Sequence, residues 1–186
     1  KRTKFKIIKL SAEEIEEKMN QGINLNKIEA RKAADIINVL IKLTHQIKYS
    51  ISGENRKVDV VNKDVNEVEV IIDCPSNNIL RWQNYLLNFL HNKNLVLKCE
   101  HKADINHVVV SAASILGKVT RDAEVEKIKN KYNVDFGSGY PSDPLCVEFL
   151  KTPQAKMLMK EGLIRKSWQT WRREEKKQGQ RKLDEF

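Results

Sequence analysis

The sequence predicts an α/β protein in which helices flank a parallel sheet. Two short apolar runs, EVEVIID at 67–73 and LVLKC at 95–99, have the alternation and the β-branched content of strands. A helical repeat of apolar residues at 79–90 separates them. Two strands joined through a helix form a parallel βαβ unit. The length of 186 residues and the hydrophobic content of 40% allow one compact domain with a small appendage.

The residues before this unit predict a short strand and two helices. Residues 5–10 are expected to form the strand. Ser11 and Glu14 have the spacing of a capping box, which opens the first helix. Asn26 is the expected N-cap of the second helix, whose apolar residues recur at helical spacing to about Leu43.

Two polar stretches and a long helix are predicted further along the chain. Residues 48–66 are polar and charged and predict a surface loop. Residues 108–132 predict a long helix that is small and apolar in its first turns and strongly charged later. The segment FGSGYPSDP at 136–144 is rich in turn-forming residues and predicts a loop.

The last part of the chain predicts a separate helical region. We divide the sequence into a main domain over residues 1–144 and a helical C-terminal region over 145–186, which ends in a basic amphipathic segment. Trp168 and Trp171 lie three positions apart in that segment. They could stack on nucleic acid, but aromatic residues at helical spacing more often anchor a helix to its core, and we favour packing.

The charge balance is compatible with a polyanionic partner. The chain has 34 Lys and Arg against 25 Asp and Glu, a net charge of +9, with the excess at its two ends. Such an excess is typical of nucleic-acid-binding proteins, whose basic margins contact phosphates. It is equally compatible with two solvated termini, so charge alone leaves both interpretations open.

Cysteine usage and hydropathy indicate the compartment. The three cysteines are an odd number without CxxC spacing, which argues against a disulfide framework and against a zinc site. No apolar run has the length needed to span a bilayer. We therefore expect a cytoplasmic protein without a membrane partner.

Two acidic residues follow the two predicted strands. Asp73 ends the first strand, and Asp104 lies shortly after the second. In open α/β sheets functional groups gather at the carboxyl ends of strands. Paired carboxylates there suit hard ions such as Mg²⁺ or Mn²⁺, and two-metal cleavage of phosphodiesters uses such groups. The alternative is that Asp73 accepts turn amides and Asp104 is a helix N-cap.

Several motifs resemble one known family. The segments occur in the family's order and are EHKAD at 100–104, VVSAASIL and KVTRD within 109–122, GSGYPSDP at 137–144 and RKSW at 165–168. Weaker likeness extends to residues 10–15 and 24–30. Together these segments resemble type 2 ribonuclease H, or ribonuclease HII, and its archaeal branch in particular.

The resemblance implies a fold and an activity. The fold is a ribonuclease H-like mixed sheet flanked by helices, with a small helical C-terminal region that contacts the duplex. The activity is endonucleolytic cleavage of RNA in RNA–DNA hybrids, on the 5′ side of ribonucleotides at RNA–DNA junctions. The implied cofactor is Mg²⁺ or Mn²⁺, and the implied partner is an RNA–DNA hybrid or a DNA duplex with an embedded ribonucleotide.

The resemblance also implies roles for individual residues. Asp73 and Asp104 match two of the four acids in the family's two-metal cluster, and Tyr140 matches the tyrosine that stacks on the sugar at the junction. We expect catalysis to involve these three residues. Further residues on the same motifs could hold phosphates, although each could equally be solvated or cap a helix: Lys102, Ser111, Lys118 and Arg121.

Three other polar residues near these motifs have open or structural roles. Asp122 is either a second acid behind the site or a surface ion-pair partner of Arg121 or Lys118. His101 and His107 lack a matching ligand motif, and we interpret both as structural or surface residues.

The family's opening strand has no counterpart in this sequence. That strand carries an Asp-Glu pair and a Gly-Arg-Gly segment, and the sequence instead opens at Lys1, without an initiator Met, at a point that resembles a later part of the family. Three interpretations follow: a fragment of a longer enzyme, one piece of a split enzyme whose partner polypeptide supplies the Asp-Glu strand, or a non-catalytic nucleic-acid-binding relative. The presence of Asp73 and Asp104 favours the first two.

Overall fold

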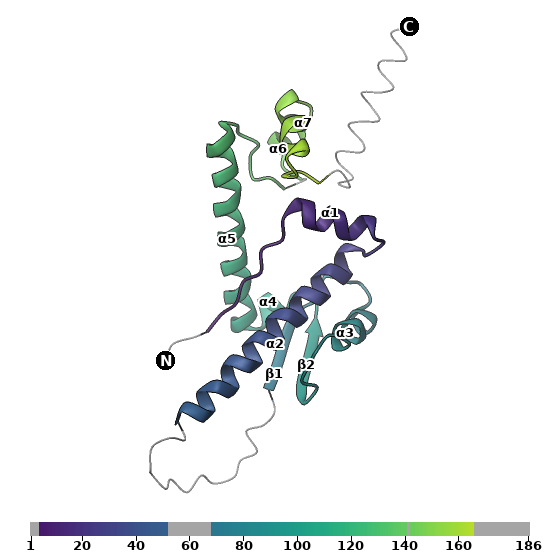
Figure 1. Ribbon diagram of the computed structural model, residues 1–186, viewed down its shortest axis with the longest axis vertical. Coiled ribbons are helices and arrows are strands. Elements are labelled where there is room, and N and C mark those ends of the chain that lie inside the picture. The colour runs from purple at the N-terminus through teal and green to yellow at the C-terminus, as the bar shows by residue number, and fades with distance from the viewer. Residues whose placement is uncertain (1–3, 52–67, 141, 166–186) are drawn as a thin grey trace, which may run out of the picture. The chain divides into compact units, whose positions relative to one another are not determined.

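The computed structural model describes residues 4–51, 68–140 and 142–165, and their helices and strands are labelled in Figure 1. In chain order the elements are α1 (Ala12–Asn20), α2 (Leu25–Ile51), β1 (Val68–Asp73), α3 (Ile79–Leu87), β2 (Leu95–Glu100), α4 (Ala103–Asn106), α5 (Val108–Tyr132), α6 (Pro144–Phe149) and α7 (Pro153–Lys160). None of the described helices is both long enough and apolar enough to cross a membrane.

The chain forms two compact units. The first, which we call the sheet unit, consists of Lys1–Lys9 and Asn24–Ser114. The second, the helical unit, consists of Leu10–Ile23 and Ile115–Phe186. The helix α5 therefore contributes its first residues to the sheet unit and the remainder to the helical unit.

The two strands of the sheet unit pair in parallel. Val68 lies opposite Leu95, and Asp73 lies opposite Glu100 at the carboxyl end. This pairing confirms the predicted βαβ unit and the α/β class. Because side chains alternate between the faces of a strand, one face turns its apolar residues toward the helices. The residues of that face that pack on the core are Val70, Ile72, Leu95, Leu97 and Cys99.

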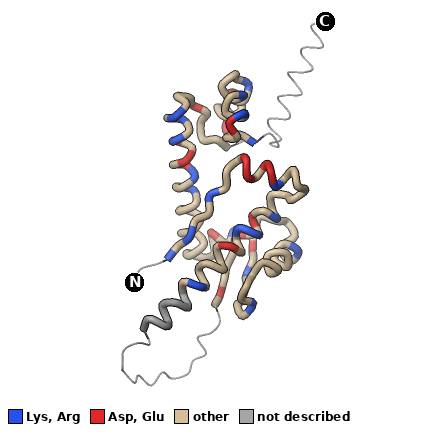
Figure 2. The backbone as a smooth tube through the Cα atoms, viewed as in Figure 1, with Lys and Arg blue, Asp and Glu red and all other residues tan. Residues whose placement is uncertain are grey.

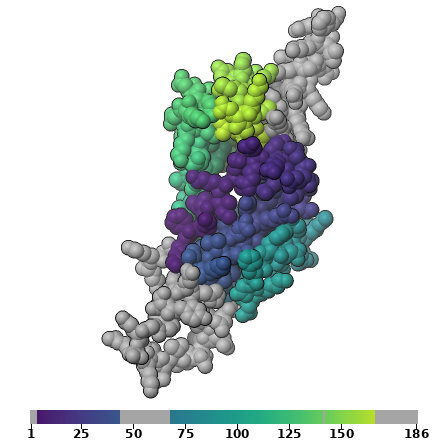
Figure 3. Space-filling view, viewed as in Figure 1, coloured from purple at the N-terminus to yellow at the C-terminus, as the bar shows by residue number. Residues whose placement is uncertain are grey.

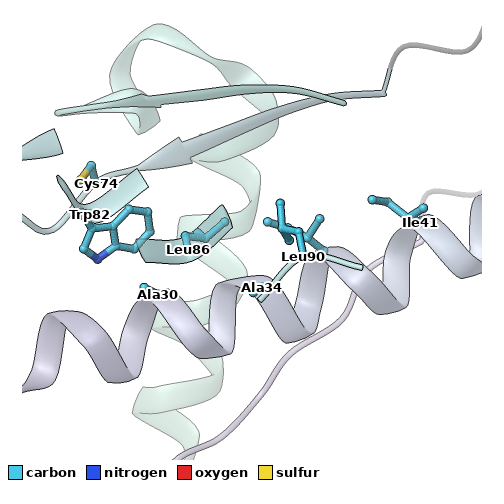
Figure 4. Close-up of a cluster of buried hydrophobic side chains, with 8 residues drawn as sticks. Ala30, Ala34, Ile41, Cys74, Trp82, Leu86 and Leu90 are labelled. Carbon is cyan, nitrogen blue, oxygen red and sulfur yellow. The ribbon is translucent and has the colours of Figure 1, made fainter. Parts of the chain in front are cut away.

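The core of the sheet unit lies between α2, α3 and the strands. Figure 4 shows Trp82, Leu86 and Leu90 between α2 and the sheet. The space-filling view shows the teal surface of α3 and β2 directly against the blue surface of α2 (Figure 3). Small residues on α2 allow this close approach. The buried members of the cluster are Ala30, Ala34, Ile37, Ile41, Cys74, Trp82, Leu86 and Leu90.

Two predictions for the first part of the chain are wrong. Residues 5–10 do not form a strand, because a strand requires a backbone neighbour and no backbone hydrogen bond among the described residues pairs this segment. The N-cap of α2 is Asn24, whose Oδ1 accepts the amide of Lys27 at 3.0 Å. Asn26 lies inside the first turn, and its carbonyl accepts the Trp82 indole N–H at 2.9 Å.

The remaining helix and loop predictions agree more closely. The long helix at 108–132 has the predicted bounds in α5. The second helix extends past the predicted end at Leu43 to Ile51, so residues 48–51 of the predicted loop are helical. The remainder of that loop, 52–66, lies outside the described residues.

The helical unit is built from capped helices around a second core. Ser11 caps α1, and its Oγ accepts the amide of Glu14 at 3.0 Å, which confirms the N-cap of the predicted capping box. Thr152 caps α7 in the same way. The buried core residues are Phe149, Leu150, Ala155 and Leu158, and Ile128 and Tyr132 of α5 pack on them. Trp168 and Trp171 lie outside the described residues.

The packing of α3 predicts a clear difference between two leucines of that helix. Leu86 is fully buried, whereas Leu80 is 69% exposed. Leu86→Ala should lower the free energy of unfolding by about 2–5 kcal/mol, because it removes buried methyl groups and leaves a cavity. The matched control Leu80→Ala should change it by less than about 0.5 kcal/mol. Urea unfolding followed by circular dichroism measures both, and equal effects would contradict this description of the core.

Candidate active site

Asp73 and Asp104, the two acids that follow the strands, both lie at the carboxyl edge of the sheet. Asp73 is the last residue of β1, and Asp104 lies in α4, the one-turn helix that follows β2. The helix α4 packs on β1, and the amide of Ala103 points to Asp73 Oδ1 at 3.4 Å. The Asp73 side chain is exposed and Asp104 is half-buried. The structure therefore brings these two carboxylates to one end of the sheet unit.

The backbone at Lys102 makes this arrangement possible. Lys102 has φ 58° and ψ 35°, the left-handed conformation that non-glycine residues seldom adopt. The turn that results directs the buried Ala103 toward β1. Lys102 occupies the N-cap position of α4 without a side-chain cap bond, so the alternative that Asp104 caps this helix is wrong. Asp73 does accept one turn amide, as its alternative interpretation required, but at the long distance of 3.4 Å.

Glu100 is a third acid at this edge, and the sequence did not single it out as a site residue. It lies opposite Asp73 in the strand register. Its Oε1 lies 2.6 Å from His107 Nε2 and accepts Asn106 Nδ2 at 3.4 Å. His107 separates α4 from α5. Glu100 thus fastens the far end of α4 to the strand, and its place as the last strand residue is the signal that could have identified it.

The histidines have the structural roles expected of them. His101 Nδ1 lies 3.1 Å from the carbonyl oxygen of Cys74, just beyond β1. His107 holds Glu100, as described above. His101 therefore ties the segment after β2 to the segment after β1, whereas His107 ties the start of α5 to the end of β2.

The acidic side chains at the sheet edge are of the chemical type that hard divalent ions bind. Asp73 and Asp104 both offer carboxylate oxygens, which Mg²⁺ and Mn²⁺ prefer. Burial raises the pKa of the nearby Cys99 thiol to about 11, so this thiol stays protonated at neutral pH and is a poor ligand for soft metals. Within residues 4–51, 68–140 and 142–165 no group of three His, Cys, Asp or Glu side chains is arranged to hold a metal ion. Among the described residues, Asp73 and Asp104 remain the two acids of the predicted metal site.

The predicted phosphate-binding residues are distributed between the two units. Lys102 is exposed beside the acids, and Ser111 lies half-buried on the first part of α5. Lys118 and Arg121 lie further along α5 in the helical unit, where Figure 2 shows several blue bands of basic residues on this helix. Lys118 is exposed, whereas Arg121 is half-buried.

Tyr140 lies in the helical unit against Arg121. The guanidinium carbon of Arg121 lies 3.8 Å from the centroid of the Tyr140 ring, and the tyrosine residue remains 46% exposed. Arg121 Nη1 also donates to Asp122 Oδ1 at 3.0 Å. Of the two interpretations of Asp122, the structure shows the ion pair with Arg121.

The loop that carries Tyr140 is held by Asp143. Its Oδ2 accepts the amide and the hydroxyl of Ser138, both at 2.7 Å, and its Oδ1 accepts the amide of Leu145 at 2.9 Å, which caps α6. These hydrogen bonds from Ser138 and Leu145 hold the pKa of Asp143 below its usual value. Gly137 has φ 64°, and a Cβ there would lie 2.5 Å from Asp143 Oδ2. The turn-rich sequence predicted a loop, but not that Asp143 organises it.

A groove elsewhere in the sheet unit does not coincide with these residues. It has a volume of about 590 Å³ and lies between the N-terminal end of α2 and one side of α3. Its lining includes Asn24, Asn78 and Tyr85, with Lys27 and Arg81. Neither acid of the sheet edge lines it, so it is not part of the candidate site.

The pKa of Asp143 generates a prediction about pH. Because this pKa is lowered in the folded protein, the carboxylate stabilises the loop above its unfolded pKa of about 3.9, and this contribution is lost as the pH falls through the lower folded value. Asp143→Ala should therefore lower the midpoint of thermal unfolding at pH 7 and reduce its dependence on acidic pH. The control Asp35→Asn alters an exposed helical acid and should do neither. An unchanged acid dependence in Asp143→Ala would contradict this assignment.

Comparison with known proteins identifies relatives of the chain. Residues 2–171 match the family model described as Ribonuclease HII. A Ribonuclease HII of Methanococcus maripaludis (strain C6) is 37% identical over 164 residues, which cover 87% of this chain and 66% of that protein. A Ribonuclease HII of Pyrococcus furiosus is 36% identical over 186 residues, which cover 98% of this chain and 70% of that protein.

Solved structures show the same relationship. The ribonuclease HII in the PCNA:RNase HII complex from Archaeoglobus fulgidus matches with a TM-score of 0.58 at 29% identity, over 87% of this chain and 65% of that one. The ribonuclease H2 of Pyrococcus horikoshii matches with a TM-score of 0.58 at 30% identity, over 90% and 66%. The chain thus spans about two thirds of these proteins. The likeness confirms the expected ribonuclease H-like α/β fold, and the chain belongs to the ribonuclease HII family.

Proposed function

We propose that the protein cleaves RNA in RNA–DNA hybrids as an endonuclease. The scissile bond is the phosphodiester on the 5′ side of a ribonucleotide, and the products carry 5′-phosphate and 3′-hydroxyl ends. The observation that carries this proposal is the placement of both Asp73 and Asp104 at one edge of the sheet in a chain of the ribonuclease HII family.

In this proposal Asp73 and Asp104 are the ligands that the described chain offers to Mg²⁺ or Mn²⁺. Such ions, when bound in pairs, activate the attacking water and stabilise the leaving oxygen. The amide of Ala103 orients the Asp73 carboxylate from one end of α4. Glu100, held by His107 and Asn106, fixes the other end of the helix that carries Asp104. These contacts limit the movement of both carboxylates, and fixed ligands lose less conformational entropy on binding.

Five residues of the family motifs contact the nucleic acid in this proposal. Tyr140 stacks on the sugar beside the junction and reads the context of the 2′-hydroxyl. Phosphates are contacted by residues of the neighbouring motifs, namely Lys102, Ser111, Lys118 and Arg121. We assign catalysis to a domain over residues 1–144, and the helical region over 145–186 makes further contacts with the duplex. The biological role is removal of primers and misincorporated ribonucleotides in the cytoplasm.

A non-catalytic nucleic-acid-binding role is the second candidate. It is favoured by the net charge of +9 and by the half-exposed Tyr140. Basic side chains and an exposed ring can contact a duplex without a metal ion. The two candidates differ in what they require of Asp73, because binding alone does not use its charge.

Asp73→Asn should abolish cleavage and spare duplex binding, because it removes a ligand charge with little change of shape. We expect cleavage to fall by more than about 100-fold, since loss of a residue that only supports a metal ligand already costs 10–100-fold. The control is Glu69→Gln, because Glu69 is exposed on the same strand and pairs with Lys98, away from the carboxyl edge. The measurement is cutting of a DNA duplex containing one ribonucleotide with Mn²⁺, alongside binding by fluorescence anisotropy.

The same assay separates the two candidate functions. It is run with the chain alone and with an added peptide that carries an Asp-Glu and a Gly-Arg-Gly segment. Metal-dependent cutting in either case supports the enzymatic function, provided that Asp73→Asn eliminates the cutting. Undiminished cutting by Asp73→Asn contradicts the ligand assignment, and binding without cutting in both cases favours the non-catalytic module.

A further inference from the structure

The stack of Arg121 on Tyr140 is the closest cation–π contact among the described residues. The guanidinium carbon lies 3.8 Å from the ring centroid, whereas the other such contacts of the helical unit, Lys129 over Phe136 and Lys131 over Tyr132, measure 5.7 and 4.8 Å. At 3.8 Å the planar guanidinium is in van der Waals contact with the ring. A charged group therefore lies against the Tyr140 ring, and the residue is still 46% exposed.

Arg121 is itself fixed by two further contacts. Its Nη1 donates to Asp122 Oδ1 at 3.0 Å, which anchors one side of the guanidinium. A Cβ on Gly139 would lie 3.1 Å from Nη2, so the absence of a side chain at Gly139 lets the guanidinium approach the loop closely. Gly139 also has φ 69°, a conformation that glycine adopts without strain. The arginine is thus held between its neighbour on α5 and the loop that carries Tyr140.

We propose that Arg121 is the positioning residue for Tyr140 and thereby a determinant of sugar discrimination. This inference rests on the function proposed above. Tyr140 has the exposed surface needed to stack on a sugar, and the ring contact that the structure shows for it is the one with Arg121. The guanidinium supports the ring from the α5 side and limits its rotation. A ring held in one orientation loses less entropy when a ligand stacks on it.

This role differs from a phosphate contact in a way that can be measured. A phosphate contact serves DNA and RNA alike, so its loss weakens binding to all duplexes. Loss of a positioning residue weakens only the contact that distinguishes the sugar. Arg121→Lys separates the two, because lysine keeps the charge but lacks the planar group that stacks.

The first experiment measures binding of the full chain to two labelled duplexes of one sequence, all-DNA and with a single ribonucleotide, with Ca²⁺ present. Arg121→Lys should reduce the preference for the ribonucleotide about three- to tenfold, the range for loss of a partly exposed cation–π contact. Its affinity for the all-DNA duplex should stay within about twofold of the unsubstituted chain, because the charge is retained. Lys131→Ala is the matched control, since it removes a cation–π contact elsewhere on α5.

The outcomes separate this inference from the proposed function. The inference is supported if the unsubstituted chain and Lys131→Ala both prefer the duplex with the ribonucleotide and Arg121→Lys does not. Preference that Arg121→Lys retains, or an equal loss of affinity for both duplexes, overturns the inference and leaves the proposed function standing. Equal binding of the two duplexes by the unsubstituted chain contradicts sugar reading by Tyr140, and with it both proposals.

A second measurement tests the stack without any nucleic acid. In the nuclear magnetic resonance spectrum the Nε proton of Arg121 should be shifted upfield by the current of the Tyr140 ring. Tyr140→Phe should keep that shift, and Tyr140→Leu should remove it. The inference is overturned if the folded, unsubstituted chain shows no such shift, or if the shift remains in Tyr140→Leu.

Discussion

The parallel pairing of β1 with β2 is the interaction on which the candidate site depends. Its register sets Asp73 beside Glu100 at the carboxyl end of the strands. From that point the chain continues into α4, whose two ends are tied back to these same residues through Ala103 and His107. A slip of one residue would turn the strand side chains to the opposite face, so the apolar core on α2 and α3 also determines where the acids lie.

Much of this fold could be predicted because periodic patterns report directly on burial. The strands at 67–73 and 95–99 and the helix at 108–132 have long or regular patterns, and each was located within about a residue or two. The segment 5–10 has a strand-like composition, but strand formation depends on a neighbour that a local pattern does not contain. The N-cap of α2 was misplaced because Asn24 and Asn26 are chemically identical candidates, and tertiary contact with Trp82 distinguishes them.

The candidate site was predictable to a different extent. Asp73 and Asp104 could be expected at one edge because their places at strand ends follow from the topology. The roles of Glu100, Arg121 and Asp143 could not be derived in this way, since each depends on a partner brought close by the fold: His107, Tyr140 and Ser138. Sequence spacing indicates which residues share an element, but not which side chains meet between elements.

The motifs of the chain therefore contain two kinds of residue with different physical demands. Asp104 and Tyr140 need accessible surface, because their proposed ligands are an ion and a sugar. Glu100 and Arg121 need neighbours, because they act by holding an element or a ring in place. Glu100 and Asp104 share one motif, whereas Arg121 and Tyr140 come from two motifs that the fold brings together. A left-handed backbone lies beside each pair, at Lys102 and at Gly139. A preorganised site therefore depends on polar residues that hold its ligand-binding groups in place as well as on those groups themselves.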